Sequence, residues 1–176
     1  EKLEVHTPNR TTQRHHRILY NELEKLLQVN PVKVAKQTES NIALHEVSEL
    51  LHKRSLVMIF TDFIHSNKTL DEQFSSYKHL KYNKHEVVLF FLNEPITEKD
   101  LDFDNNAYKF VDLETREEIK LSPILYQKKY KEQAENYLKE LRLKCLQYKI
   151  DFVEVDINMG FDKVLNSYLL KRQKML

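Results

Sequence analysis

Glycine is almost absent from this chain, because Gly160 is the only one among 176 residues, whereas an average protein contains about 7%. Loops that cradle phosphate groups, such as the Walker loop and the dinucleotide-binding turn, need several glycines close together. The sequence therefore excludes both kinds of site. Turns that require a positive φ must use other residues, at a conformational cost.

Cysteine is equally scarce. Cys145 is the only one, so no disulfide can form within the chain, which fits a reducing compartment and predicts a cytoplasmic protein. No cysteine and histidine cluster has zinc-site spacing, and the neighbours His15 and His16 would point to different faces of a helix. No apolar run reaches the roughly 18 residues of a membrane span, and no signal peptide opens the chain.

Neither sign of charge is in clear excess, since 28 Lys and Arg against 27 Asp and Glu give a net charge of +1. So weak a field disfavours binding to nucleic acid, although small basic patches lie at residues 14–17 and 171–174. Hydrophobic residues make up 41% and charged residues 31%, a balance typical of a soluble folded domain. The length predicts a single domain over residues 1–176.

The stretch at residues 56–62 organises the rest of the interpretation. Residues 56–60 form an unbroken apolar run, which Thr61 and Asp62 follow at once. Such a run predicts a strand covered on both faces, as in a parallel sheet flanked by helices. Ligands of these sheets bind outside the carboxyl ends of the strands, where Asp62 could hold a cation or a partner, or simply cap the next loop.

The remaining patterns alternate between helix and strand. Ser40 and Asn41 precede a helix that leads into residues 56–62, so they could reach the same rim, although an ordinary helix cap explains them equally. The first predicted elements are a short strand at 3–6, a helix capped by Thr11 or Thr12 that ends at Pro31, a loop at 32–39 and a helix from Ser40 or Asn41. Strands at 56–62 and 86–92 follow, with a helix between them that the capping box at 69–72 opens. The last predicted elements are strands at 108–113 and 118–121, a helix from Ser122 and Pro123, a strand at 151–156 and a helix after Gly160.

These patterns predict an α/β fold with a mostly parallel, Rossmann-like, three-layer sheet and flanking helices, together with a β-hairpin excursion near residues 108–121. The first predicted helix carries Ile18, Leu19, Leu23, Leu26 and Leu27 on one face, and the second is expected to bury Ile42, Val47, Leu50 and Leu51. No nucleophile elbow is present. An enzyme would most plausibly be a metal-assisted hydrolase that uses Asp62 with Asp156 or Asp151, and we expect a protein that is not an enzyme.

Residues 40–44 (Ser-Asn-Ile-Ala-Leu) and residues 56–63 (Leu-Val-Met-Ile-Phe-Thr-Asp-Phe) resemble a von Willebrand factor A-like domain. More narrowly, they are similar to the bacterial domain of unknown function 58 family, as are residues 6–10, 110–115 and 165–172. The resemblance covers nearly the whole chain, but only the later two-thirds or so of the family's domain. It therefore implies an incomplete domain that lacks its first strands.

The resemblance also implies a metal-ion-dependent adhesion site, in which a divalent cation lies on top of the sheet. Asp62 takes the role of the aspartate after the fourth strand, and Ser40 stands where a threonine ligand would be. The Asp-x-Ser-x-Ser motif is absent and should lie before Glu1. Two ligands are too few for a hard cation that takes about six oxygens, so we expect no stable metal in this chain, although Mg²⁺ or Mn²⁺ would fit the intact domain.

As an expectation from the resemblance, the chain is a protein–protein interaction module that works with a MoxR-type AAA+ ATPase. In the family fold, the first strand lies beside the strand placed here at residues 56–62. Without it, that strand presents a hydrophobic edge to other chains. We therefore expect self-association through this edge, or its coverage by residues 3–7.

Overall fold

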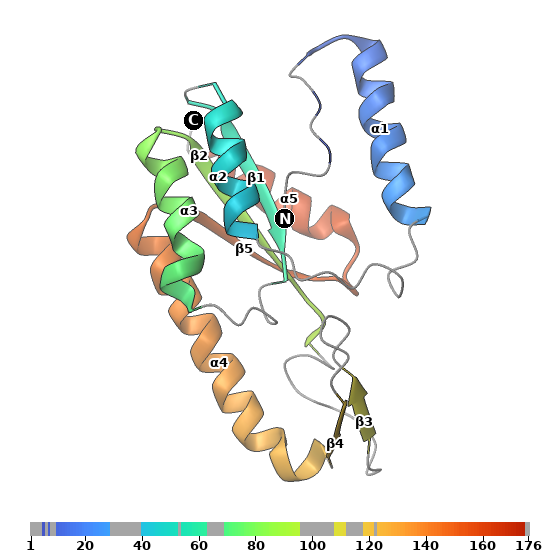
Figure 1. Cartoon of the computed structure of the whole chain (residues 1–176), viewed down its shortest axis with the longest axis vertical. Helices are drawn as coiled ribbons and strands as arrows, with labels where there is room; N and C mark the ends of the chain where they lie inside the picture. The colour runs from blue at the N-terminus through green and yellow to red at the C-terminus, as the bar shows by residue number, and fades with distance from the viewer. Residues whose placement is uncertain are drawn as a thin grey trace.

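The computed structural model describes residues 5, 7, 10–28, 40–52, 54–62, 69–95, 108–111, 118–121 and 123–174. Figure 1 shows helices on both sides of a small sheet, with a separate hairpin at one end of the molecule. The elements are α1 (Gln13–Gln28), α2 (Ser40–Leu50), β1 (Leu56–Thr61), α3 (Leu70–Tyr82), β2 (Glu86–Asn93), β3 (Tyr108–Val111), β4 (Glu118–Leu121), α4 (Pro123–Gln147), β5 (Asp151–Asp156) and α5 (Phe161–Gln173).

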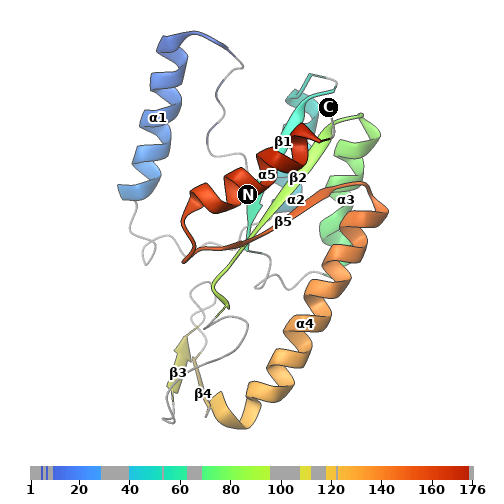
Figure 2. The same cartoon turned by 180° about the vertical axis from the view of Figure 1, so that it is seen from behind.

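The main sheet has the order β1-β2-β5, and both pairs of neighbouring strands are parallel. A helix lies in each connection, as parallel strands require. Figure 2 shows α5 on the side of the sheet opposite to α3 and α4. The predicted α/β class, with a parallel sheet between layers of helices, is therefore confirmed.

The core divides between the two faces of the sheet. The main core lies between the sheet and helices α3 and α4, and the second core lies under α5, where Val88 and Phe90 pack with Tyr168. Strand β2, which lies between β1 and β5, contributes buried side chains to both cores. The buried members of the main core are Leu70, Phe74, Tyr77, Leu80, Val87, Leu89, Phe91, Leu138, Leu141, Cys145 and Ile150.

The capping box that opens α3 is formed as the sequence predicts. The Thr69 backbone N–H donates to a Glu72 carboxylate oxygen at 2.8 Å, and the Glu72 backbone N–H donates to the Thr69 hydroxyl at 3.4 Å. These bonds satisfy donors that the first turn of a helix otherwise leaves free. The helical stripe that follows is buried throughout.

One prediction about β1 is wrong, because this strand is covered on one face only. Leu56, Met58 and Phe60 are 39%, 45% and 62% exposed, whereas Val57 and Ile59 pack against the main core. The reason is position, since β1 lies at the edge of the sheet and α5 packs on β2 and β5. An apolar run predicts a strand with apolar side chains on both faces, but it does not show whether another element covers each face.

The two helices before β1 follow their predicted starts but not all of their predicted burial. The Thr12 hydroxyl caps α1 by accepting the backbone N–H of His15 at 3.3 Å, and α2 begins at Ser40. In α2, Leu50 is exposed, contrary to the prediction, while Leu44 and Leu51 pack against the main core. The apolar face of α1 also remains exposed, through Ile18, Leu19, Leu23, Leu26 and Leu27.

Strands β3 and β4 form the predicted antiparallel hairpin, with Tyr108 opposite Leu121 and Val111 opposite Glu118. The prediction for residues 112–113 lies outside the described residues, as do the predicted loop at 32–39 and Pro31. The predicted strand at 3–6 also lies outside them, except for Val5, which is exposed and not in a strand. Helix α4 begins at Pro123 as predicted. No helix in the described ranges is long and apolar enough to cross a membrane.

Because glycine is scarce, other residues take the left-handed positions in the turns that precede the strands of the main sheet. Arg54, Lys84 and Lys149 have φ values of 64°, 64° and 54°, and each stands two residues before β1, β2 or β5. These are the left-handed turn positions that glycine usually fills. Gly160 itself has a φ of −54°; a Cβ there would lie 2.6 Å from a carboxylate oxygen of the exposed Asp162, a contact that a shift of that side chain relieves.

The α3 cap predicts a measurable loss of stability. Replacing Thr69→Ala removes both the acceptor for Glu72 and the hydroxyl that bonds its carboxylate, so the free energy of unfolding should fall by about 1 kcal/mol. Urea denaturation, with an unchanged dependence on denaturant, measures this loss. Ser75→Ala, an exposed serine inside α3, serves as the control and should cost clearly less; an equal loss would contradict the role of the cap.

Cys145 should be unreactive until the protein unfolds. Its side chain is buried in the main core, and this burial raises the pKa of the thiol to about 12. Because only the thiolate attacks disulfide reagents, a chromogenic disulfide at pH 8 should label the native chain at least 100-fold more slowly than the chain in guanidinium. Rapid labelling of the native chain would show that this part of the core opens readily.

Candidate functional site

Three polar residues mark the ends of the three parallel strands. Asp62 follows β1, while Asn93 and Asp156 are the last residues of β2 and β5. The register pairs Thr61 with Phe91 and Asn93 with Asp156, so the three ends lie at the same edge and within one residue of the same level. We call this the carboxyl edge. Since β2 lies between the other two strands, the backbones at Asp62 and Asp156 are about 10 Å apart.

Asp62 lies at the carboxyl edge, where the sequence placed it, and its side chain is exposed. It makes no hydrogen bond or ion pair with any residue that the structure describes. Ser40 begins α2, whose Leu44 and Leu51 pack on the same core as Val57 and Ile59 of β1. The helix therefore runs back along the strand, and its first turn lies near the end of β1 (Figure 1). The side chain of Ser40 lies outside the description.

Asn93 is the functional candidate that sequence reasoning missed. Its side chain is buried, its amide Nδ2 donates to a Glu154 carboxylate oxygen at 3.4 Å, and its Oδ1 has no partner among the described residues. Glu154 is also paired with Arg142 of α4. A buried acceptor without a partner is unusual and marks a place where a donor or cation could bind. The only signal in the sequence was an amide that directly follows an apolar run.

The turn after β5 is fastened to the end of β2. An Asp156 carboxylate oxygen accepts the backbone N–H of Asn158 at 2.9 Å, and the Asn158 side chain donates to Glu94 at 3.4 Å. The Ile157 backbone N–H donates to the Asn93 carbonyl at 3.0 Å. Asp156 thus stabilises its own turn, a common use of an aspartate at a strand end.

Alternation along the strands directs two polar groups of the carboxyl edge to the same side of the sheet. Phe91 and Phe152 pack against the main core, so Asn93 and Asp156, at even spacing from them, point to the side of α3 and α4. Asp62 lies one residue beyond the end of β1, so the alternation of that strand does not set the direction of its side chain. No group of three or more His, Cys, Asp or Glu in the described residues is placed to hold a metal.

Of the two carboxylate pairs suggested for hydrolysis, the pair of Asp62 with Asp151 is wrong. Asp151 begins β5 and therefore lies at the opposite edge of the sheet from Asp62. Its carboxylate accepts a hydrogen bond from Lys171 Nζ at 2.6 Å. Asp156 does share the carboxyl edge with Asp62. The neighbouring histidines separate as expected, since His15 is buried and His16 is exposed.

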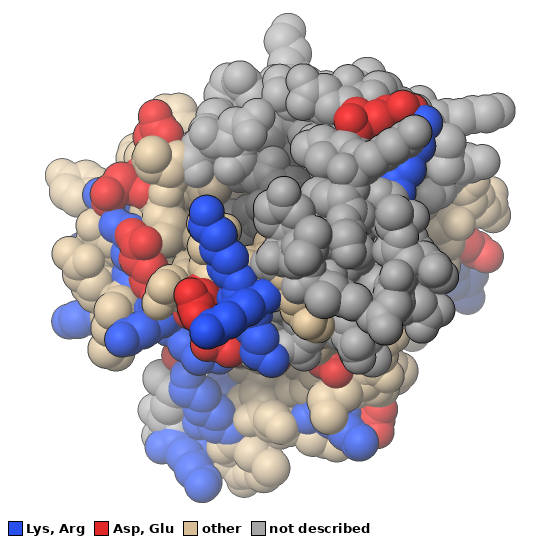
Figure 3. Space-filling model, turned by 90° about the horizontal axis from the view of Figure 1, so that it is seen from below, with Lys and Arg blue, Asp and Glu red and all other residues tan. Residues whose placement is uncertain are grey.

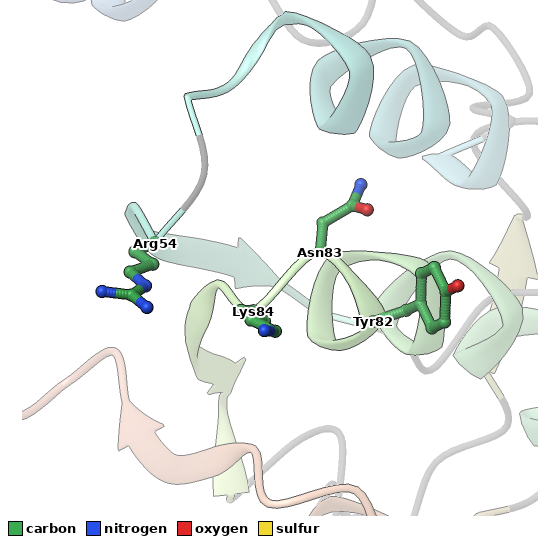
Figure 4. Close-up of a pocket in the computed structure, with 4 residues that line it drawn as sticks. All are labelled: Arg54, Tyr82, Asn83 and Lys84. Carbon is green, nitrogen blue, oxygen red and sulfur yellow. The ribbon is translucent and has the colours of Figure 1, made fainter.

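Two pockets lined by described residues do not include Asp62. One of about 410 Å³ is lined by Arg54, Tyr82, Asn83 and Lys84, which precede β1 and β2 at the amino ends of the strands. Figure 4 shows these four side chains pointing in different directions from their turns, without converging on one point. A second, of about 290 Å³, is lined by Thr7, Arg10, Thr12, Arg14, His15 and Ile18.

Charges are mixed over the surface. On the face seen in Figure 3, basic and acidic side chains among those drawn in colour lie beside one another. Ion pairs such as Lys144 with Asp71, at 2.7 Å, and Arg172 with Glu86, at 2.6 Å, join different elements. The guanidinium and ammonium partners of these pairs have raised pKa values because they hydrogen-bond to carboxylates, and the pKa of Asp71 is lowered by Lys144.

The surroundings of Asn93 predict that the stability of an Asn93→Asp variant depends on pH. Asn93→Asp would bury a second carboxyl beside Glu154, in place of the donor now at 3.4 Å, and the proximity of two carboxyls raises their pKa values. Because a raised pKa favours the folded state only while the group is protonated, the variant should lose stability as pH rises. Relative to the original chain, we expect a loss of about 1–3 kcal/mol at pH 7 and less at pH 4.5.

Urea denaturation of both chains at the two pH values measures this difference. Asn158→Asp, at an exposed position of the same edge, is the matched control and should show little dependence on pH. A penalty for Asn93→Asp that is equal at both pH values would mean that the introduced carboxyl is solvated.

Comparisons with models of protein families, with curated proteins and with solved structures found no match to this chain. Its function must therefore be argued from its own geometry. That geometry consists of an exposed carboxylate on the edge strand, a buried amide on the central strand and an aspartate fixed in a turn on the third, all at the carboxyl edge of one parallel sheet.

Proposed function

We propose that this chain is a non-enzymatic protein–protein interaction module of the von Willebrand factor A type, which binds its partner at the carboxyl edge of the sheet. The observation that carries the proposal is the exposed carboxylate of Asp62, directly after β1 and without a partner among the described residues. In open α/β sheets this is the edge at which ligands bind.

Asp62 and Ser40 would be two ligands of a bridging Mg²⁺ or Mn²⁺ at this edge. Both cations prefer oxygen ligands and take about six, so the other oxygens would come from water, from a partner carboxylate and from the Asp-x-Ser-x-Ser motif of the intact family domain. Asn93 is bonded to Glu154 and Asp156 to its own turn, and they are not members of this set. The cation would thus be held in the complex and not by residues 1–176 alone.

The partner that we propose is a MoxR-type AAA+ ATPase. This choice rests on the family resemblance of residues 40–44 and 56–63 and is therefore an analogy. The mixed charges of the described surface disfavour nucleic acid as the partner, since affinity for its phosphates needs a basic field.

This proposal predicts that binding depends on the Asp62 carboxylate. With a purified MoxR-type ATPase in Mg²⁺, Asp62→Ala should weaken the affinity at least ten-fold, equivalent to about 1.4 kcal/mol, because one cation ligand is lost. Biolayer interferometry with the immobilised chain measures the change. Glu49→Ala, which removes an exposed carboxylate near the other end of α2, is the control and should leave the affinity unchanged.

Two further arms of this experiment test the role of the cation. EDTA should reduce the affinity of the original chain to that of Asp62→Ala and should leave the variant unaffected. Calorimetric titration of Mn²⁺ into the free chain should show no binding tighter than about 1 mM, because two protein oxygens are too few. An affinity that neither Asp62→Ala nor EDTA changes would sink the proposal.

A metal-assisted hydrolase is the alternative, and one observation favours it: Asp156 shares the carboxyl edge with Asp62. Against it, an Asp156 oxygen already accepts a backbone hydrogen bond within its own turn. Mn²⁺-dependent hydrolysis of a phosphate ester that is lost in both Asp62→Ala and Asp156→Ala would establish the alternative.

A further inference from the structure

The outer edge of β1 has no neighbouring strand among the residues that the structure describes. Among the described residues, β1 pairs only with β2. The Ser55 carbonyl accepts the Glu86 backbone N–H at 2.9 Å, so the backbone groups of Ser55 are directed toward β2. Because these groups alternate along an extended strand, those of Leu56, Met58 and Phe60 point outward. An edge of this kind invites pairing with a further strand.

The same three residues also present the uncovered apolar side chains of β1. They lie on the side of the second core, where α5 packs through Val164 and Tyr168 on residues of β2 and β5. Phe60 is stacked on Phe90, with ring centroids 4.7 Å apart, so its position is fixed although most of its surface remains exposed. A strand added beside β1 would therefore gain both hydrogen bonds and apolar neighbours.

The charges at the two ends of β1 indicate which strand fits. Arg54 stands two residues before the strand and Asp62 one residue after it, and neither makes an ion pair with a described residue. If two β1 strands paired in antiparallel orientation around Met58, Arg54 of each copy would lie opposite Asp62 of the other. The pair would therefore contain two such contacts. Leu56 would lie opposite Phe60, and Met58 opposite itself.

We infer that β1 pairs with β1 of a second copy of this chain across a two-fold axis at Met58, so that the two three-stranded sheets become one continuous sheet. The backbone supports this register, because each facing pair combines residues whose N–H and C=O groups point outward, as hydrogen-bonded pairs of antiparallel strands require. A shift by two residues would keep these bonds but separate Arg54 from Asp62. The same patch serves both copies, as a two-fold interface demands.

This inference stands apart from the proposed partner, although Asp62 belongs to both. Self-pairing is measured as mass without a partner or a cation, so its failure would leave the binding proposal untouched. Equally, loss of partner binding would not change the mass of the chain.

Sedimentation equilibrium over about 5–200 µM tests the pairing. The chain should form a dimer, and Met58→Lys should weaken it at least ten-fold, because it places two like charges opposite each other on the axis. Lysine is compatible with the folded monomer at this position, since Met58 is 45% exposed. Leu143→Lys, at an exposed position of α4, should leave the dimer unchanged.

Exchange of the charges tests the register. Arg54→Asp and Asp62→Arg, each alone, should weaken the dimer several-fold, because like charges would then face each other, whereas the two substitutions together should restore it. A monomer for the original chain at 200 µM would overturn the inference. A double variant no better than the single ones would overturn the Arg54–Asp62 register.

Cross-linking fixes the axis without relying on stability. Met58→Cys would bring two cysteines to a Cα separation of about 5.5 Å, which a disulfide can span. Leu56→Cys is the matched control, because its two copies would lie four residues apart along the strands, about 13 Å. Mild oxidation should therefore cross-link the first and not the second, while the buried Cys145 takes no part. Equal cross-linking of both variants would contradict an axis at Met58.

Discussion

Burial of β2 on both faces is the interaction on which the rest of the structure depends. Alternate residues of this strand enter the main core and the second core, and each large apolar side chain that is fully buried contributes about 1.5–3 kcal/mol. With β2 held between helices on both sides, β1 and β5 add to it in parallel. Their common direction brings Asp62, Asn93 and Asp156 to one edge, so the candidate site is a consequence of how the central strand is buried.

The amino ends of the strands show which residues take the left-handed turn positions in a chain with one glycine. Three basic residues take the left-handed turn positions before the strands, and a non-glycine residue there costs roughly 1–2 kcal/mol. His85 fixes one of these turns: it is buried, and its Nδ1 accepts the Ser55 backbone N–H at 3.2 Å. This bond joins the start of β1 to the start of β2. Within the described ranges, the positive φ values of non-glycine residues lie at the amino ends of the strands.

Local signals predicted much of this fold, and the errors arise where neighbours decide. The capping box at Thr69 and the apolar run of β2 describe their own segments, and the structure confirms both. The burial of Leu50 and of β1 depends on which elements pack against them, and no local pattern contains that information. Asn93 was missed for the same reason, because its buried contact is with Glu154, 61 residues away. Asp62 was found because its place after a strand is itself a local signal.

The position of Asp62 on an edge strand links the two surfaces proposed for this chain. A cation bound by its carboxylate would neutralise the charge that, in the paired strands, faces Arg54 of the second copy. The two events are therefore expected to oppose each other, and by linkage each must weaken the other by the same factor. Because only the end pairs of β1 carry charge, the apolar pairs between them would persist when the cation binds. The coupling is thus limited to what the two Arg54–Asp62 contacts contribute, so a partner that binds through the cation would weaken the pairing of β1 without abolishing it.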